Sequence, residues 1–358
     1  MHNPTLASLC LLAGLAACGS DGGDGGGGDG GPDGPDAPPF TSGVSTLAGH
    51  AEPGAVDGPR GTARFANPVN VAVGPDGKVY VADFDNGTIR AVDAATGTTT
   101  TVVDQEGFRR PFGLAFDADG KLYVGTDNDA TGAHNERSGT IWRVSLTARS
   151  ASVVAENVGR ARGLVALDDG RVVFSDYQAH TINIVNPATG AVSVLAGAPG
   201  QTGTVDGTGG AARFAAPYGL AQRSDGSLVV ADHDNHNLRL VTLDGTVTTY
   251  AGTGAAGYAD GAMGAARFAN PQGLAIAQNG DLFVSDLGNF RVRRIRGTTV
   301  ETVVGSGEGG FQDDDNNLAA EVYGLEGIAA SPDGAMLFIA DGGRGEDVPF
   351  NRIRSAKL

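Results

Sequence analysis

Two histidines, His233 and His236, are separated by the His-x-x-His spacing of a possible zinc-ligand pair. Imidazole nitrogens bind zinc well, but both rings must face the same ion. The surrounding residues 232–237 read as a polar turn, in which this spacing does not direct both side chains to one side. We therefore expect no metal at this pair. His236, and His180 at the same place in another repeat, are expected to serve packing or turn formation.

Carboxylates recur at one place in the chain, at the end of a short apolar run. The positions are Asp83, Asp176, Asp232, Asp286 and Asp341. A carboxylate there can accept backbone N–H groups of the following turn, as in an Asx turn. A catalytic acid is more often found in one repeat only than at the same position in almost every repeat. The repetition therefore predicts a structural role, and Thr126 stands where one more aspartate is expected.

The histidines and aspartates described above belong to a repeated sequence, and the structure of this repeat must position them. Residues 62–71, 211–220 and 265–274 read TARFANPVNV, AARFAAPYGL and AARFANPQGL, and weaker copies bring the total to six. Each copy contains an apolar run, an Asp-Gly or Asn-Gly turn and a second apolar run, which is a hairpin signal. Second runs such as KVYVAD and SLVVAD are apolar almost throughout, and strands of this kind are buried on both faces. This pattern favours the stacked blades of a propeller.

We therefore predict an all-β fold, a six-bladed β-propeller of four-stranded antiparallel blades. The last unit stops after its third strand, whereas an orphan strand VSTLAG at 44–49 precedes the first unit. The N-terminal strand is thus expected to complete the last blade, which removes an exposed edge. The predicted propeller covers 44–358, with repeats near 50–103, 104–157, 158–197, 198–252, 253–305 and 306–358. Phe65, Phe214 and Phe268, from the repeated A-R-F-A-x-P, are expected to fill the space between blades.

This arrangement resembles the NHL-repeat family. The resemblance rests on P-x-G-L-A, the Asp-Gly turn, V-x-V-A-D and the pattern D-x-x-N-x-x-I/L/V-R at 232–239 and 286–293. It implies a six-bladed propeller, a fold that supports unrelated functions. Related propellers include metal-dependent lactonases and lyases, whose chemistry lies where the inner strands begin at the mouth of the channel. The aligned positions here are Val69 or Asn70, Phe112, Arg162, Tyr218, Gln272 and Glu326.

A catalytic metal at this mouth would need about three converging histidines or carboxylates. Only Glu326 is a carboxylate, and none of the aligned residues is histidine. We therefore predict no catalytic residue, no metal and no other cofactor. A metal near Glu326 is kept as the alternative.

Two insertions set two repeats apart from the others. Residues 128–138 lengthen a turn of the second repeat, and residues 342–350 lengthen the equivalent turn of the sixth. Long loops on a rigid scaffold often carry recognition, and ring closure would place both insertions beside the first repeat. We predict a binding rim with Phe112, Arg162 and Tyr218 nearer the channel. The remaining rim residues are Phe84, Asp85, His134, Glu136, Arg137, Arg344, Glu346 and Phe350. The alternative is that the insertions are tolerated without a function.

The N-terminal segment resembles a bacterial lipoprotein signal. Residues 6–17 form an apolar run too short to span a bilayer, and the run ends in Leu-Ala-Ala-Cys, which is similar to a lipobox. Residues 1–17 are then the signal peptide, Cys18 carries the lipid, and the Gly/Asp-rich residues 18–43 form a disordered tether. An ordinary cleaved signal or a short buried helix is the alternative. We expect a secreted protein held to a membrane by lipid alone, in the periplasm or at the cell surface.

Charge and cysteine content restrict the partners. A formal net charge of −16 argues against nucleic acid, and the two cysteines both precede the propeller. We expect a monomer that binds an unidentified protein or envelope ligand. The predicted function is a non-catalytic binding or protein-interaction module of a cell-envelope lipoprotein. The alternatives are a metal-dependent hydrolase or lyase with its site at the channel mouth, and a purely structural envelope protein.

Overall fold

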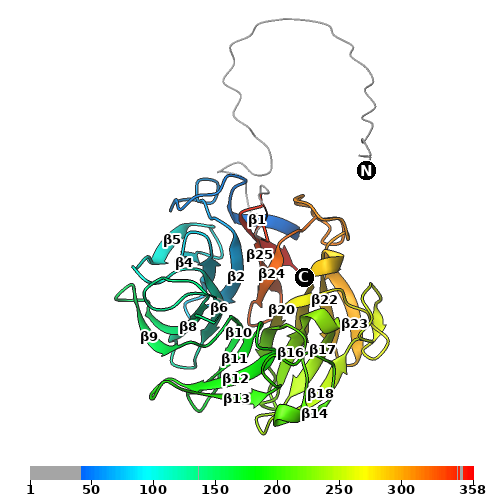
Figure 1. Ribbon diagram of the computed structural model, residues 1–358. Coiled ribbons are helices and arrows are strands. Elements are labelled where there is room, and N and C mark those ends of the chain that lie inside the picture. The colour runs from blue at the N-terminus through cyan, green and yellow to red at the C-terminus, as the bar shows by residue number, and fades with distance from the viewer. Residues whose placement is uncertain (1–41, 136, 345, 347–349) are drawn as a thin grey trace, which may run out of the picture.

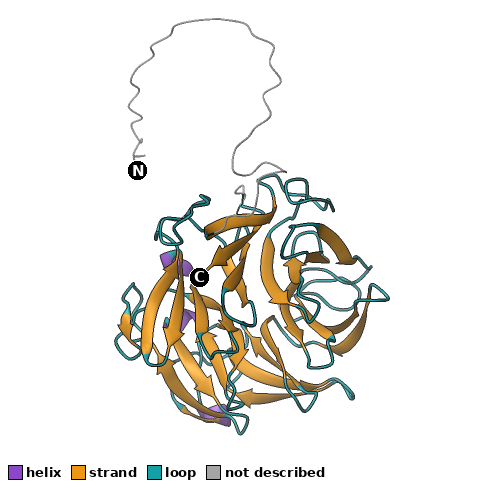
Figure 2. Ribbon diagram, turned by 180° about the vertical axis from the view of Figure 1, so that it is seen from behind, coloured by secondary structure: helices purple, strands orange, loops and turns teal. Residues whose placement is uncertain are grey.

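The computed structural model describes residues 42–135, 137–344, 346 and 350–358. Their strands form six antiparallel sheets arranged around a central channel, and the chain passes through the blades in order around the ring (Figure 1). Seen from behind, the described part of the chain consists of strands and loops with three short 3₁₀ turns (Figure 2). The predicted all-β, six-bladed propeller is confirmed.

Each of the first three blades has four strands in sequence order. Blade one contains β2 (Pro68–Val73), β3 (Val79–Asp83), β4 (Thr88–Val92) and β5 (Thr99–Val103). Blade two contains β6 (Pro111–Phe116), β7 (Leu122–Thr126), β8 (Thr140–Ser145) and β9 (Ser150–Glu156). Blade three contains β10 (Ala161–Ala166), β11 (Val172–Asp176), β12 (Thr181–Asn186) and β13 (Ala191–Ala196).

Blades four and five each gain a two-residue edge strand from the connection that precedes them. Blade four contains β14 (Gly207–Thr208), β15 (Pro217–Gln222), β16 (Leu228–Asp232), β17 (Asn237–Val241) and β18 (Thr246–Ala251). Blade five contains β19 (Gly261–Ala262), β20 (Pro271–Ile276), β21 (Leu282–Asp286), β22 (Arg291–Arg296) and β23 (Thr299–Val304). The 3₁₀ turns are η1 (Gly209–Ala211), η2 (His233–Asn235) and η3 (Leu287–Asn289).

Blade six joins the two ends of the chain. It contains β24 (Leu325–Ala330), β25 (Met336–Asp341), β26 (Arg352–Lys357) and, as its outer strand, the N-terminal β1 (Gly43–Gly49). β1 is antiparallel to β26, with Val44 opposite Ala356. The predicted closure by the N-terminal strand is confirmed, and it removes the free edge that β26 would otherwise present.

The second strand of each blade is buried on both faces, as its composition predicted, apart from the partly exposed Met336 that begins β25 in blade six. Every residue of β3, β7, β11, β16 and β21 is buried. The phenylalanines of the A-R-F-A-x-P segments are also fully buried. Each of them packs against a buried guanidinium, with Arg90 lying 5.1 Å from the centroid of Phe65 and Arg239 lying 5.3 Å from that of Phe214. The prediction that these rings fill space between the blades is confirmed.

The recurring aspartates are structural. Asp176 accepts the backbone N–H groups of Gln178 and Ala179 in the following turn, as predicted, whereas the aspartates of blades one, four, five and six accept backbone N–H groups of the preceding connection instead. The Asp83 carboxylate accepts the backbone N–H of Ala66, which lies in the preceding connection rather than in the following turn. It also accepts the Asn86 amide and forms a 2.9 Å ion pair with Arg90, whose side chain is fully buried. Asp232, Asp286 and Asp341 pair in the same way with Arg239, Arg293 and Arg354. In blades one, four and five this arginine follows the aspartate by 7 residues, whereas in blade six the insertion separates Asp341 from Arg354 by 13. In all four blades the arginine supplies the counterion inside the blade.

His180 and His236 connect neighbouring blades. The Nδ1 atoms of the two rings accept backbone N–H groups of Ala216 and Asn270, at 3.0 and 3.1 Å. Both histidines have a left-handed backbone, with φ of 60° and 54°. Their predicted turn and packing role is confirmed. No helix among the described residues is long and apolar enough to cross a membrane.

Candidate functional site

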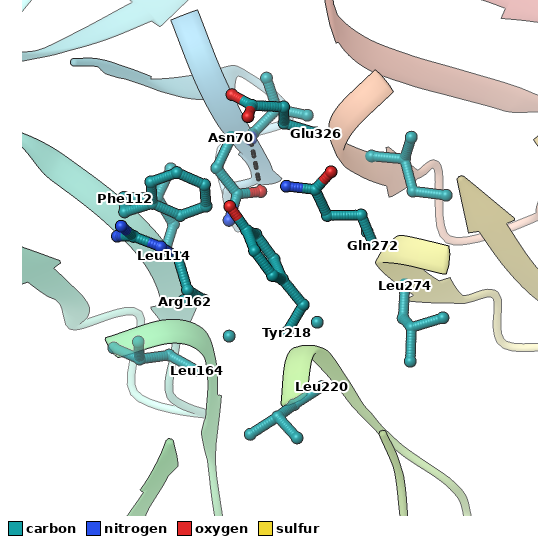
Figure 3. A pocket seen from close by; sticks show the side chains of 15 residues that line it. Asn70, Phe112, Leu114, Arg162, Leu164, Tyr218, Leu220, Gln272, Leu274 and Glu326 are labelled. Atoms are coloured by element: carbon teal, nitrogen blue, oxygen red, sulfur yellow. Dashed lines mark hydrogen bonds between the residues drawn. The ribbon is translucent and has the colours of Figure 1, made fainter. Parts of the chain in front are cut away.

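The inner strands present one side chain each at the mouth of the central channel. β6, β10, β15, β20 and β24 contribute their second residue, which is Phe112, Arg162, Tyr218, Gln272 and Glu326 in turn. Figure 3 shows these side chains converging from separate strands around one small space. The channel-mouth residues that the sequence predicted therefore lie together.

A layer of glycines beneath these side chains lets the inner strands approach one another. A Cβ atom on Gly219 would lie 2.3 Å from the carbonyl oxygen of Gln272, and a Cβ on Gly163 would lie 2.5 Å from that of Tyr218. Blade one has Asn70 at the glycine position, and this amide lines the cavity in place of Val69. The sequence left open which of these two residues faces the channel, and the structure selects Asn70.

The cavity at the mouth has a volume of about 60 Å³, and two of the polar side chains that line it have an oxygen without a hydrogen-bond partner among the described residues. Within the described residues, Gln272 Oε1 and Glu326 Oε2 are buried and accept no hydrogen bond. Burial raises the pKa of Glu326 to about 7 even though the positive charge of Arg162 acts in the opposite direction. A buried acceptor without a partner costs free energy, so this cavity suits waters or the polar group of a ligand.

Arg162 is fixed by an acid that the sequence analysis did not select. Its Nη1 and Nη2 donate to the two carboxylate oxygens of Asp127, at 2.6 and 2.9 Å. The guanidinium also lies 4.2 Å from the centroid of Phe112. Asp127 directly follows Thr126, the exception in the aspartate series, so this departure was the available signal. Because the Asp127 carboxylate and the Phe112 ring both hold this guanidinium, Arg162 forms a rigid wall of the channel mouth.

Aromatic rings connect the channel mouth to the outer rim. Phe84 packs edge-on against Phe112 at 6.1 Å, and Phe112 packs edge-on against Tyr218 at 5.5 Å. Tyr218 also contacts Tyr177 at 5.3 Å and His233 at 5.5 Å. Burial raises the pKa of Tyr218 and lowers that of His233, so both rings are neutral near pH 7. Tyr177 and His233 were absent from the predicted site, because their repeat positions appeared to be ordinary turns.

A second cavity, of about 350 Å³, lies at the rim between blades one and two. Three predicted rim residues, Phe84, Asp85 and His134, line it together with Arg109 and Arg110. His134 Nδ1 donates to the backbone carbonyl of Asp127 at 2.8 Å, which fixes the position of the ring. Burial raises the pKa of Asp85, and the nearby Arg110 partly offsets this shift. We call these five residues the rim cluster.

The remaining predicted rim residues lie elsewhere. Arg137 lines a different cavity, between blades two and three. Arg344, Glu346 and Phe350 gather around Tyr323 in blade six, where Phe350 stacks on the tyrosine ring at 4.8 Å and Arg344 lies 5.2 Å from its centroid. The two insertions therefore contribute to separate groups of side chains. Glu136 and the lipidation position Cys18 lie outside the described residues.

The donor atoms at the channel mouth do not fit a catalytic metal. In the part of the chain that the structure describes, no group of three or more His, Cys, Asp or Glu residues could hold a metal ion. His233 Nδ1 lies 2.7 Å from the Asp234 carboxylate, whereas His236 Nδ1 is occupied by a backbone N–H, so the two rings have separate partners. Among the described residues that line the channel mouth, the side chains that could add oxygen ligands to Glu326 are neutral amides and a phenol.

A family model described as the SMP-30/Gluconolactonase/LRE-like region matches residues 54–253, more than half of the chain. The chain belongs to the SMP-30/gluconolactonase/LRE-like family. A second model, the NHL repeat, matches residues 268–295 in blade five. The predicted resemblance to NHL-repeat propellers is therefore confirmed, and blades one to four carry the SMP-30/gluconolactonase/LRE-like match.

Two curated relatives of this family member are longer proteins. SUPPRESSOR OF QUENCHING 1, chloroplastic, of Arabidopsis thaliana is 27% identical over 291 residues, covering 70% of this chain and 27% of that protein. NHL repeat-containing protein 2 of Bos taurus is 27% identical over 298 residues, covering 68% of this chain and 41% of that protein. The chain thus spans less than half the length of either relative.

Several solved structures share the propeller of this SMP-30/gluconolactonase/LRE-like chain. An auxiliary nutrient binding protein from Bacteroides thetaiotaomicron aligns with a TM-score of 0.68 and 17% identity, covering 87% of this chain and 75% of that one. A putative gluconolactonase aligns with a TM-score of 0.55 and 12% identity, covering 89% and 93%. A streptogramin B lyase aligns with a TM-score of 0.54 and 12% identity, covering 88% and 97%. These similarities show the fold alone.

Proposed function

We propose that this chain is a non-catalytic binding module whose ligand occupies the rim cluster and reaches toward the channel mouth. The observation that carries the proposal is the convergence of Phe84 and Asp85 with His134, from another blade, on one 350 Å³ cavity. That volume suits a small molecule. Phe84 connects the cavity to the aromatic rings above the channel, so one bound molecule can contact both regions.

The charges of the rim cluster favour a ligand with a negatively charged group. Arg109 and Arg110 both line the cavity and both are exposed to solvent, whereas Asp85 is the only acid among the described residues that lines it with them. Arg109 donates to the backbone carbonyls of Gln105 and Phe108, which holds its guanidinium at the cavity. Guanidinium groups bind carboxylate and phosphate well, and a fixed guanidinium loses less entropy on binding.

The proposal includes attachment to the cell envelope. The lipobox-like Leu-Ala-Ala-Cys ending at Cys18, followed by a Gly/Asp-rich segment, supports a lipid anchor and a tether in front of the propeller. A monomer in the periplasm or at the cell surface would then present the rim to envelope ligands. Labelling cells with radioactive palmitate tests this part. Incorporation that is lost in Cys18→Ser is expected, and equal labelling of the two forms would contradict it.

The binding role is tested by ligand capture with the full chain. The protein is dialysed against a filtered metabolite extract, and small molecules retained at 1:1 stoichiometry are identified by native mass spectrometry. We expect anionic compounds to be retained, and to be lost in Arg110→Ala and Phe84→Ala. Arg223→Ala is the matched control, because this arginine lies in the turn after β15, at the other end of its blade, beside Asp225. Retention that is equal in all four proteins would contradict the proposal.

A second candidate function is acid–base catalysis at Glu326, in a hydrolase or lyase. The observation that favours it is a carboxyl group with a pKa of about 7 and a free buried oxygen, facing a cavity next to Tyr218 and Gln272. The family match and the fold shared with a putative gluconolactonase and a streptogramin B lyase also support it. Turnover of a lactone or lyase substrate that Glu326→Gln abolishes would establish this function in place of simple binding.

A further inference from the structure

Blade three lacks an ion pair that four other blades contain. In blades one, four, five and six, a fully buried arginine pairs with the aspartate that ends the second strand. In blade one the arginine is Arg90, which lies opposite Val81 in the register of β3 and β4. The equivalent residue of blade three is Asn183, which lies opposite Phe174. Its amide donates to Thr181, whereas the hydrogen bonds that Asp176 accepts within the described residues come from backbone N–H groups.

Asp176 has also lost its second side-chain partner. In blade one, Asn86 donates to the Asp83 carboxylate at 2.7 Å, but Ala179 stands at the equivalent place in blade three. Asp176 is only 8% exposed. The hydrogen bonds it accepts within the described residues all come from backbone N–H groups, those of Arg160, Gln178 and Ala179, and all end on Oδ1. A carboxylate that is nine-tenths buried and has no cationic partner is costly in free energy.

The segment that covers this position in blade one is missing from blade three. In blade one the connection between β1 and β2 packs over Arg90, which donates to the carbonyls of Val56 and Arg64. Between β9 and β10 only residues 157–160 remain. Val158 stands at the position of Phe65, so the ring that packs on the guanidinium is absent as well.

A cavity of about 510 Å³ opens where these groups are missing. Its lining residues are Arg137, Asn157, Gly159, Asp176, Gln178, Ala179, Pro199 and Gly200. Asp176 supplies the acid, and Gly159 allows the close approach of its Oδ2, which would lie only 2.1 Å from a Cβ atom at that glycine. Arg137, from the blade-two insertion, supplies a cation on the same cavity. The volume is sufficient for an amino acid or a slightly larger molecule.

We propose that this cavity is a second binding site, for a basic amino acid. The guanidinium or ammonium group of the ligand takes the place that the blade arginine holds beside aspartate in the other blades. The ligand's carboxylate pairs with Arg137, which would repel a cation that lacked an acidic group. The site is separate from the rim cluster, so it does not depend on the function proposed above.

The test measures binding of L-arginine to the full chain by isothermal titration calorimetry, with agmatine and L-glutamate as comparison probes. We expect saturable 1:1 binding of L-arginine, binding of agmatine that is at least about tenfold weaker because it lacks the carboxylate, and no binding of L-glutamate. Absence of L-arginine binding at millimolar concentration would overturn the proposal. Agmatine binding as tight as that of L-arginine would overturn the assignment of Arg137.

Two substitutions connect the binding to Asp176. Asp176→Asn keeps the Oδ1 acceptor for the three N–H groups but removes the charge, and we expect affinity to fall at least about tenfold. Asn183→Arg supplies an internal guanidinium at the position of Arg90, so it should abolish L-arginine binding and raise the melting temperature. Leu243→Arg is the matched control, since Leu243 is exposed in the turn between β17 and β18 of blade four and receives the same charge. Binding that survives Asn183→Arg in a folded protein would overturn the proposal.

Discussion

Arg162 and Asp127 form a bidentate ion pair at the channel mouth, with N–O distances of 2.6 and 2.9 Å and both side chains less than one-tenth exposed. The acid comes from the turn that carries the blade-two insertion, and the arginine comes from the inner strand of blade three. The pair therefore fixes the mouth of the channel to the loop that carries His134.

Loss of this acid should be costly, because it leaves a buried guanidinium without a counterion. We predict that Asp127→Ala lowers the free energy of unfolding by about 3–5 kcal/mol, measured by urea denaturation. Asp119→Ala is the control, since Asp119 pairs with Lys121 in an exposed turn and should change nothing measurable. Equal effects of the two substitutions would show that the buried pair does not hold the mouth together.

The raised pKa of Glu326 makes stability depend on pH. The folded protein favours the protonated carboxyl, so the stabilising contribution is complete below the ordinary value of 4.5 and is lost as pH rises through about 7. Glu326→Gln, which cannot ionise, should therefore be more stable than the parent chain by about 1–3 kcal/mol at pH 8. At pH 4 the two proteins should have the same melting temperature. A stabilisation that is the same at both pH values would contradict the assigned shift.

The glycine layer should not accept a methyl group. Gly219→Ala places a Cβ atom against the carbonyl of Gln272, and we expect a loss of about 2–3 kcal/mol in the free energy of unfolding. Gly210→Ala is the matched control, because a Cβ atom at that glycine would have no other atom within 4 Å. Thermal melts of the two variants provide the comparison, and a fully stable Gly219→Ala would show that neighbouring inner strands can move apart.

Ring closure by β1 predicts a sharp boundary for N-terminal truncation. A chain that starts at residue 42 keeps β1 and should melt like the full chain. A chain that starts at residue 50 exposes the edge of β26, and its melting temperature should fall by more than about 10 °C with a tendency to associate. Identical melting and a monomeric state for both chains would show that β1 contributes little to the ring.

The sequence predicted the fold because each blade repeats the same turns and apolar runs. The closing strand was also predictable, since VSTLAG resembles the outer strands of other blades and the last unit lacks one. The Asp–Arg pairs were not predicted, although Asp83 and Arg90 are only 7 residues apart, because the pattern does not show that the arginine turns into the blade. There Arg90 also reaches Asp57 and the Val56 carbonyl, 33 and 34 residues away in the chain. A local motif does not reveal which of its residues turn inward.

The site was predicted in part. The channel-mouth residues follow from repeat alignment, and Phe84, Asp85 and His134 follow from the position of an insertion. Arg109 and Arg110 were missed because they precede an inner strand rather than lie in the inserted loop. The separation of the two insertions was also missed, because Tyr323 holds Phe350 and Arg344 in blade six through ring contacts. Such contacts depend on three-dimensional packing that spacing in the sequence does not encode.

The most direct test of the binding role is to measure whether the protein changes the ligand that it captures. The molecule retained by the full chain is incubated with a stoichiometric amount of the protein and recovered, and its mass is then measured by mass spectrometry. The same incubation is carried out with the Arg110→Ala and Glu326→Gln variants. The account predicts that the ligand returns unchanged, that Arg110→Ala fails to retain it, and that Glu326→Gln leaves its mass the same. Conversion to a product of different mass by the parent chain, stopped by Glu326→Gln, would contradict a binding module and establish an enzyme.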